Sequence, residues 1–515
     1  MVQSAKHRQP LSRQPIWRRG KFWMIASVLA AVVAIGGVVY MIHPSQPPVI
    51  PIRVSRETTY VTEPLKPYGM VDYPEVLRRR LGPPPAAEDN AAVLLLDVTG
   101  DVNGSSFGRE DCARAREMLH LPQTGPAGLR FVSMSQLFQA RTAPPGTLGA
   151  PVETSEDDWE KFYQANAPAL DQAVKASRCP NLYLPFMDDT WARPHVGAIV
   201  LLEFGGLSAY LGNRAFYRSG KGQTDEAWED FFAAIRLARL LSQVPFGDSL
   251  MTAQYKEHQV LQMGQFIARS GTLSESQAKA ALEQLRALPP AADAGPHLEL
   301  ARLQSLYRVT LLARDGLEHV PRMFTGVPDG QRIQERGIDW NPAMELINRT
   351  FDRIDQAAGI KTFEERWTAL AEIKHEMDQW AKQYDMMTST RPARRRLFNN
   401  ESPQITLLRE NIAADPARAV AANVMSASSV SLISMNESNR IRVKALEVRL
   451  TLAAWKAKNG RYPNTLEELC PEFFESVPVD ESTGKPFEYS AEGGKYTLRT
   501  GLDVESVAPA SRASE

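Results

Sequence analysis

Apolar side chains recur three and four residues apart through most of the chain after Glu156, which is the spacing of amphipathic α-helices. Ser274, with Gln277 three residues later, has the pattern of a capping box, and Thr224 is placed to cap the helix after it. The pattern predicts a mainly α-helical protein. The predicted helices are Val196–Arg218, Asp225–Gln243, Ser249–Arg269, Ser274–Leu288, Leu298–His319, Asn341–Gly359, Thr362–Met387, Ser402–Met435 and Asn439–Lys458.

The residues before this helical stretch are less regular. Arg109–His120 has helical spacing, whereas the apolar run Asn90–Asp97 is too short to distinguish a buried helix from a buried strand. A loop rich in Pro and Gly follows, from Thr142 to Thr154. We therefore expect a small N-terminal segment, 57–155, before a helical body, 156–435.

Part of the helical body has the spacing of a tetratricopeptide repeat. Ala215, Ala227, Phe231 and Ala234 fall where that repeat places small residues for close helix packing and an aromatic to fill the gap. One unit is visible, whereas a solenoid core needs several, and a generic helical hairpin explains the same residues. We expect helical hairpins in the body, one of them TPR-like.

The C-terminal module, 436–503, has a different pattern. Asn459-Gly460 is a typical helix C-cap, and Asn464 with Glu467 predicts a short capped helix. Two strands, Pro486–Ser490 and Lys495–Thr500, flank a Gly-Gly turn, which predicts a β-hairpin in a small α+β module. The last residues, 504–515, read as a disordered tail.

The N-terminus predicts a membrane anchor. Phe22–Ile42 is 21 residues without a charge, which is long enough as a helix to span a hydrocarbon core of about 30 Å. Six basic residues and no acidic residue lie in 1–21, so the N-terminus is expected in the cytoplasm and the bulk outside it. The alternative is a cleaved signal peptide, whose apolar core is normally shorter. A stalk rich in Pro, 43–56, follows.

Composition narrows the possible partners. The formal net charge of −1 is the sum of +6 in the tail 1–21 and −7 in the remainder, and the pI near 6.8 argues against a nucleic-acid binder. The expected partners are therefore the lipid bilayer, through Phe22–Ile42, and a protein.

The three cysteines, Cys112, Cys179 and Cys470, allow one disulfide with one thiol left over, or three buried thiols.

An ordered set of short motifs runs through the C-terminal module. It consists of Gly460–Pro463, Leu466–Leu469, Val477–Asp480, Thr483–Phe487, Tyr489, Tyr496 and Gly501–Asp503. In this order the motifs resemble the C-terminal half of type II secretion major pseudopilins. The resemblance implies a local α+β fold and not filament assembly, because the prepilin leader and the directly adjoining membrane helix are missing. Some pseudopilins bind calcium in this region, and Asp503 matches their terminal acidic position.

A second set of short stretches is spread loosely over most of the chain. They are Thr59–Leu65, Val71–Tyr73, Asn90–Val93, Trp159, Asn166–Asp171, Tyr183–Pro185 and Ala227–Trp228. In these stretches the sequence is similar to an uncharacterised membrane-anchored family of planctomycete-type bacteria. The resemblance implies a bacterial inner membrane and brings no activity with it.

Motifs for chemistry are sparse. The sequence has no recognisable catalytic or cofactor motif, and adjacent acids at Asp157-Asp158 and Asp188-Asp189 are more typical of surface loops than of an acid/base pair. One string is calcium-like, because Thr99, Asp101, Asn103 and Glu110 occupy ligand positions of an EF-hand loop. An ordinary turn before a helix explains the same four residues.

Two function classes follow. The first is a single-pass membrane-anchored extracytoplasmic interaction or scaffold protein, without enzymatic activity, that binds a protein partner in a groove between helices. The alternative is an extracytoplasmic hydrolase whose acidic residues converge only in the folded chain. A deep pocket with convergent acids or histidines would favour the hydrolase, whereas a grooved helical surface with exposed apolar residues would favour the interaction protein.

Overall fold

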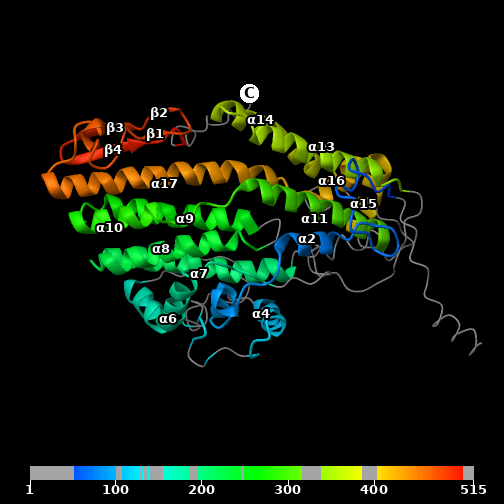
Figure 1. Cartoon of the computed structure of the whole chain (residues 1–515), viewed down its shortest axis with the longest axis horizontal. Coiled ribbons are helices and arrows are strands. Elements are labelled where there is room, and N and C mark those ends of the chain that lie inside the picture. The colour runs from blue at the N-terminus through cyan, green and yellow to red at the C-terminus, as the bar shows by residue number, and fades with distance from the viewer. Residues whose placement is uncertain are drawn as a thin grey trace, which may run out of the picture. The chain divides into compact units, whose positions relative to one another are not determined.

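Before position 195, the part of the chain that the structure describes contains four α-helices and a 3-10 turn (Figure 1). The computed structural model describes residues 52–99, 107–123, 155–184, 195–244, 249–315, 338–384 and 403–502, with a few positions between 126 and 137. The predicted tail 1–21, the transmembrane helix 22–42, most of the stalk and the tail 504–515 lie outside these ranges. Within the ranges, no helix is both long and apolar enough to cross a bilayer. The first elements are α2 (Tyr73–Leu81), η1 (Ala87–Asp89), α3 (Ala91–Leu96), α4 (Phe107–Met118) and α6 (Glu156–Ala176).

The short apolar run after Asn90 forms helix α3. Of the two alternatives predicted for this run, a buried helix and a buried strand, the structure has the helix. The Asn90 side chain caps it by accepting from the backbone N–H of Ala92 at 3.1 Å. The same amide holds the chain at Tyr183, accepting from its N–H and donating to its C=O, both at 2.9 Å. Asn90 therefore closes the start of α3 and pairs two segments 93 residues apart.

We expect Asn90→Ala to lower the free energy of unfolding by about 2–3 kcal/mol, because it removes a helix cap and leaves two polar backbone groups at Tyr183 unsatisfied. Asn464→Ala is the matched control. Asn464 is exposed, and its hydrogen bond to Glu468 at 2.6 Å comes from the backbone N–H, which alanine keeps, so the substitution should change stability by less than about 0.5 kcal/mol. Denaturant titration of the full chain measures both, and equal effects would contradict the role given to Asn90.

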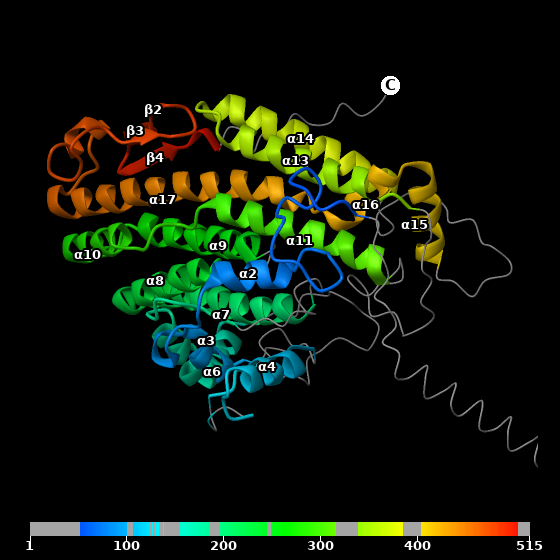
Figure 2. The same ribbon diagram turned by 45° about the vertical axis from the view of Figure 1, so that its right-hand side comes forward.

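In the helical body, α6 is followed by three long helices that pack against one another and by a shorter fourth helix (Figures 1 and 2). The capping box at Ser274 and Gln277 is confirmed. The predicted cap Thr224 is wrong, because Thr224 is the first residue of its helix and the preceding Gln223 makes no side-chain cap. The helices are α7 (His195–Gly220), α8 (Thr224–Leu241), α9 (Ser249–Arg269) and α10 (Glu275–Arg286).

Helices α7 and α8 form a closely packed hairpin. Ala215, Ala227, Phe231 and Ala234 are all fully buried. The Ser208 hydroxyl donates to the Ala234 carbonyl at 2.9 Å, which ties the two helices together. The small residues that the sequence placed at repeat spacing therefore lie where the helices need close approach.

Helix α9 packs on this hairpin through Gly264. A Cβ at Gly264 would lie 2.3 Å from Cε2 of Phe231, so the ring fills the space that the missing side chain leaves. Phe231 also packs edge-on against Trp228 and Phe232. An aromatic cluster on α8 thus sets how closely α9 approaches.

The next helices differ from their predicted bounds. The predicted helix Ser402–Met435 is wrong, since that stretch contains two helices and the start of a third. The Asp415 side chain caps a new helix at Pro416, accepting from the Arg418 N–H at 3.1 Å, and the chain leaves helical geometry again at Met425. The helices are α11 (Ala294–Asp315), α13 (Asn341–Ala358), α14 (Phe363–Tyr384), α15 (Pro403–Ala414), α16 (Pro416–Val424) and α17 (Ser428–Asn459).

Helix α17 is 32 residues long and continues through position 435, where the sequence placed the start of the C-terminal module. It ends at Gly460 with φ of 73°, as its C-cap pattern predicts. The strands after it form two hairpins, and the predicted β-hairpin is confirmed as β3 with β4. The predicted cap Asn464 is wrong, because Thr465 precedes the 3-10 helix. The elements are η3 (Leu466–Leu469), β1 (Val479–Asp480), β2 (Lys485–Pro486), β3 (Glu488–Glu492) and β4 (Lys495–Arg499).

Two hydrophobic cores hold the described residues together. The first core joins α3, α4, α6, α7, α8, α10 and most of α9 to the C-terminal half of α17 and the strands. The second core joins the loop after Ile52 and α2 to α11, α13, α14, α15, α16 and the N-terminal part of α17. The predicted fold class, mainly helical with a small C-terminal strand region, is confirmed at this level.

Candidate functional site

Helices α9, α14 and α17 enclose an open groove of about 430 Å³, which we call the apolar groove. Tyr255 stands on its rim with 48% of its surface exposed. A grooved helical surface with exposed apolar side chains is the feature that, by the sequence analysis, favours an interaction protein over a hydrolase. Its lining residues are Tyr255 and His258 of α9, Trp367, Leu370, Ala371 and Lys374 of α14, and Val430, Ser431, Ser434, Met435, Ser438 and Arg442 of α17.

Buried amides fix the walls of the groove. Asn439 of α17 is 1% exposed, and its side chain donates to the Gln254 backbone carbonyl of α9 at 2.8 Å. Gln254 in turn donates to the side chain of Asn436 at 2.9 Å. On the other wall, Arg366 of α14 pairs with Glu437 of α17 at 2.5 Å. These contacts hold α17 in one register between its two neighbours.

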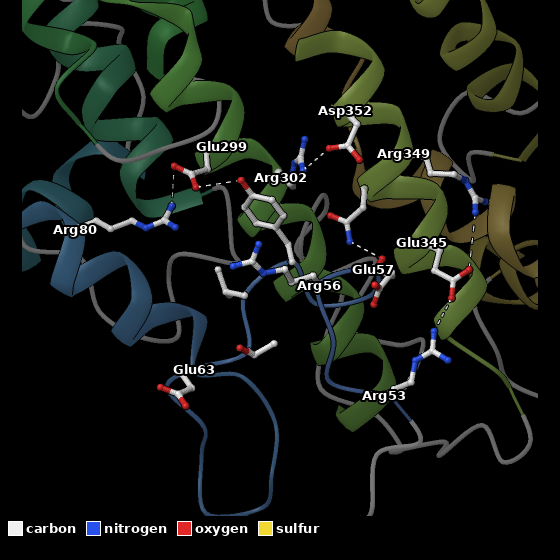
Figure 3. A pocket seen from close by; sticks show the side chains of 14 residues that line it. Arg53, Arg56, Glu57, Glu63, Arg80, Glu299, Arg302, Glu345, Arg349 and Asp352 are labelled. Carbon is white, nitrogen blue, oxygen red and sulfur yellow. Dashed lines mark hydrogen bonds and ion pairs between the residues drawn. The ribbon is translucent and has the colours of Figure 1, made fainter. Parts of the chain in front are cut away.

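A second cavity, which we call the charged pocket, has a volume of about 830 Å³ and is shown in Figure 3. It lies where the loop after Ile52 meets α2, α11 and α13. Five arginines and five carboxylates line it, so its charges are balanced. They are Arg53, Arg56, Arg80, Arg302 and Arg349, with Glu57, Glu63, Glu299, Glu345 and Asp352.

Most of these charges are already paired. Arg80 contacts Glu299, and Arg53 contacts Glu345, each at 3.0 Å. Asp352 contacts Arg302 at 2.8 Å (Figure 3). Three of the five carboxylates are therefore bound to a guanidinium, which favours a fixed charge over proton transfer.

Arg302 is the most buried cation of the pocket, with 4% of its side chain exposed. Its guanidinium contacts Asp352 and, at 2.9 Å, Asp355. It also lies over the ring of Tyr60, 4.4 Å from the centroid. Burial raises the pKa of Tyr60, and the neighbouring Glu299 raises it further, so the phenol stays neutral beside these charges.

The loop that carries Tyr60 is held to α13 by its backbone. The Asn348 side chain donates to the carbonyls of Glu57 and Thr58, both at 2.9 Å. The Arg53 N–H donates to the Asn341 side chain at 2.8 Å. The charged pocket thus fastens the first described residues, which include the end of the predicted stalk, to the second core.

We expect Arg302→Lys to speed hydrogen exchange at the loop amides of Thr59 and Val61 by about tenfold. Lysine keeps the charge but loses the fork that reaches two carboxylates and the flat stacking on Tyr60, and a charge-assisted contact is worth about 1.5 kcal/mol. Arg349→Lys is the control, because Arg349 is 66% exposed and lies 3.9 Å from Glu345. Unchanged exchange in Arg302→Lys would contradict the fastening role.

Comparison with known proteins gives no assignment. No family model, curated protein or solved structure matches the chain. The resemblances to pseudopilins and to the planctomycete-type family stay predictions, and the groove and the pocket have to be interpreted from their own side chains.

The structure describes few of the predicted calcium candidates. Thr99 is buried, and its hydroxyl lies 3.5 Å from the Cys112 sulfur, which donates to it. Asp101, Asn103 and Asp503 lie outside the described residues, as does the side chain of Glu110. Within the described ranges, no group of three or more His, Cys, Asp or Glu side chains is placed to hold a metal ion.

The remaining predicted groups have structural roles or lie outside the description. Asp158 completes a capping box with Ser155 at the start of α6, and Asp188-Asp189 is not described. None of Cys112, Cys179 and Cys470 forms a disulfide; the first is buried and the others are half-buried.

Sequence reasoning missed both cavities. The groove gathers residues from positions 255, 367 and 438, which no spacing rule connects. Arg302 carried a usable signal, because it interrupts an apolar stretch between Ala301 and Leu303. A cation on a buried helix face needs a carboxylate to balance its charge, so its presence in the sequence predicts a cluster of charges around it.

Proposed function

We propose that this chain is an interaction protein, anchored to a bilayer by residues 22–42 with its bulk outside the cytoplasm, and that it binds a polypeptide partner in the apolar groove. The observation that carries the proposal is the groove itself, an open apolar cavity with Tyr255 exposed on its rim. Exposed apolar surface framed by polar residues is typical of a binding site. The TPR-like character of the α7–α8 hairpin belongs to the same proposal, since such hairpins commonly serve as scaffolds.

The alternative, an extracytoplasmic hydrolase, draws its support from the charged pocket, which gathers five carboxylates. Three of them are bound to arginine, which favours the structural role. Glu57 is exposed, and a hydrogen bond from Ser55 lowers its pKa, so it is ionised at neutral pH and has no proton to donate. The pocket therefore supports binding better than catalysis.

Site-specific photocrosslinking in native membranes tests the proposal. A photoreactive phenylalanine at Tyr255 should give a discrete adduct that the same group at the exposed Lys495, on the C-terminal hairpin, does not give. Ala371→Gln, which fills the groove, should abolish the adduct, whereas Thr368→Gln, on a different face of α14, should preserve it. An adduct that survives Ala371→Gln, or no adduct at Tyr255, would contradict the proposal.

A further inference from the structure

The apolar groove has an uneven charge distribution. Its lining includes three basic residues, His258, Lys374 and Arg442, and no carboxylate. Close by, the ammonium group of Lys256 lies over the Tyr255 ring, 5.6 Å from the centroid. Burial and the charge of Arg442 lower the pKa of His258, so the cations that line the groove are Lys374 and Arg442, and Lys256 lies beside the exposed aromatic on the rim.

The face of α9 beside the groove is also free of acids. Its exposed residues are Tyr255, Gln262, Phe266 and Arg269. The single carboxylate of α9, Glu257, is 2% exposed and pairs with Arg239 at 2.7 Å on another side of the helix. No carboxylate of α9 thus competes for an incoming anionic group.

Two nearby carboxylates are engaged in ion pairs. Asp378 contacts Lys374 of the groove at 2.6 Å one turn along α14, an exposed pair of small energetic weight that an incoming carboxylate can replace. Glu437 is held by Arg366. Since Asp378 balances Lys374, the net positive charge beside the apolar floor comes from Lys256 and Arg442.

From this distribution we infer that the partner segment is an acidic amphipathic helix, which inserts apolar side chains between α9, α14 and α17 and sets its carboxylates against Lys256, Lys374 and Arg442. This inference rests on the proposed function and adds the chemistry of the partner. An open groove between helices matches helix-in-groove recognition, in which apolar anchors recur every three to four residues. Matching the cations with acids speeds association and rejects basic segments.

The test uses the full-length protein in detergent and two synthetic 18-residue peptides. Both carry leucine at positions i, i+3, i+4 and i+7 of each repeat; one has glutamate and the other lysine at its polar positions. Fluorescence anisotropy should give a dissociation constant at least tenfold lower for the glutamate peptide, and the difference should shrink with added salt. Equal binding of the two peptides would overturn the inference.

Variants locate the binding site. Lys374→Glu should weaken binding of the glutamate peptide at least fivefold and strengthen binding of the lysine peptide. Lys382→Glu, on the same helix outside the groove, should change the binding of neither peptide. Tyr255→Ser should weaken both peptides, and Phe266→Ser, on the same helix and also exposed, should not. Circular dichroism and the melting temperature check that each variant is folded, and the gain by the lysine peptide on Lys374→Glu cannot come from unfolding.

Other occupants give different results. Full displacement of the glutamate peptide by decanoate would identify an acyl anion as the ligand, and tighter peptide binding after deletion of residues 504–515 would identify the chain's own tail; either would overturn the inference. A crosslink at Tyr255 that is lost with Ala371→Gln but unaffected by Lys374→Glu would leave the proposed function standing and remove only the acidic partner. No crosslink and no peptide binding would remove both.

Discussion

Replacing Asp230 with alanine is expected to lower the free energy of unfolding by about 3–5 kcal/mol, because it leaves a buried guanidinium without its counter-charge. Asp230 of α8 and Arg214 of α7 have side chains that are 1% and 3% exposed. They form a two-pronged contact, with N–O distances of 2.8 and 2.6 Å, and Arg218 adds a third at 2.7 Å. Denaturant unfolding of the full chain measures the loss.

Asp171→Ala is the control for this prediction. Asp171 also contacts Arg214, at 3.0 Å, but is 61% exposed, so its removal should cost less than about 1 kcal/mol. The double variant Arg214→Met with Asp230→Leu should recover most of the stability, since apolar residues of similar size can replace a buried ion pair. A loss in Asp230→Ala no larger than that in Asp171→Ala would show that the pair is not needed for the α7–α8 hairpin.

Phe231→Ala is expected to lower the free energy of unfolding by about 3–5 kcal/mol, because it opens a cavity in the first core at the contact of α8 and α9. Gly264→Ala alone should cost about 1–3 kcal/mol, since its new Cβ overlaps the Phe231 ring. In the Phe231→Ala background, the same substitution should become neutral or stabilising, because alanine is a better helix former than glycine by about 1 kcal/mol.

The four proteins of this double-mutant cycle are compared by denaturant midpoint. The interaction between the two substitutions is the quantity of interest, and it should have the opposite sign to the two individual losses. Additive losses would mean that Gly264 and Phe231 do not limit each other's volume.

Local patterns predicted most of the helices and the final hairpin. Ser249–Arg269 was predicted with its observed bounds. Helix-breaking residues flank it in the sequence, Pro245 and Gly247 before and Gly271 after, and the apolar spacing between these flanks is regular. The failure at Ser402–Met435 has a physical origin: α15 and α16 bury faces on the same core, so the apolar spacing continues across Pro416 although the helix does not. The Asp415-Pro416 pair was the stronger signal, as a cap followed by a residue suited to the first turn.

The cavities could not be predicted in the same way. Whether Trp367 faces Tyr255 depends on the register of α14 and α17, which is set by contacts such as Asn439 with Gln254, 185 residues apart. The residue types in one helix show that one of its faces is apolar. Whether another helix covers that face depends on the packing of the whole fold. Asn90 is an intermediate case, because its capping role is visible in the sequence and its hold on Tyr183 is not.

The continuity of α17 has a consequence for unfolding cooperativity. At 1.5 Å per residue the helix is about 48 Å long, and it contributes Val430 and Ile433 to the second core and Ala445 to Ala454 to the first. The groove residues of α17, 430 to 442, begin in the second core and extend along the helix toward the first. A ligand bound there opposes melting of the helix that the cores share, so calorimetry should show the heat-absorption peaks of the two cores drawing together as ligand is added.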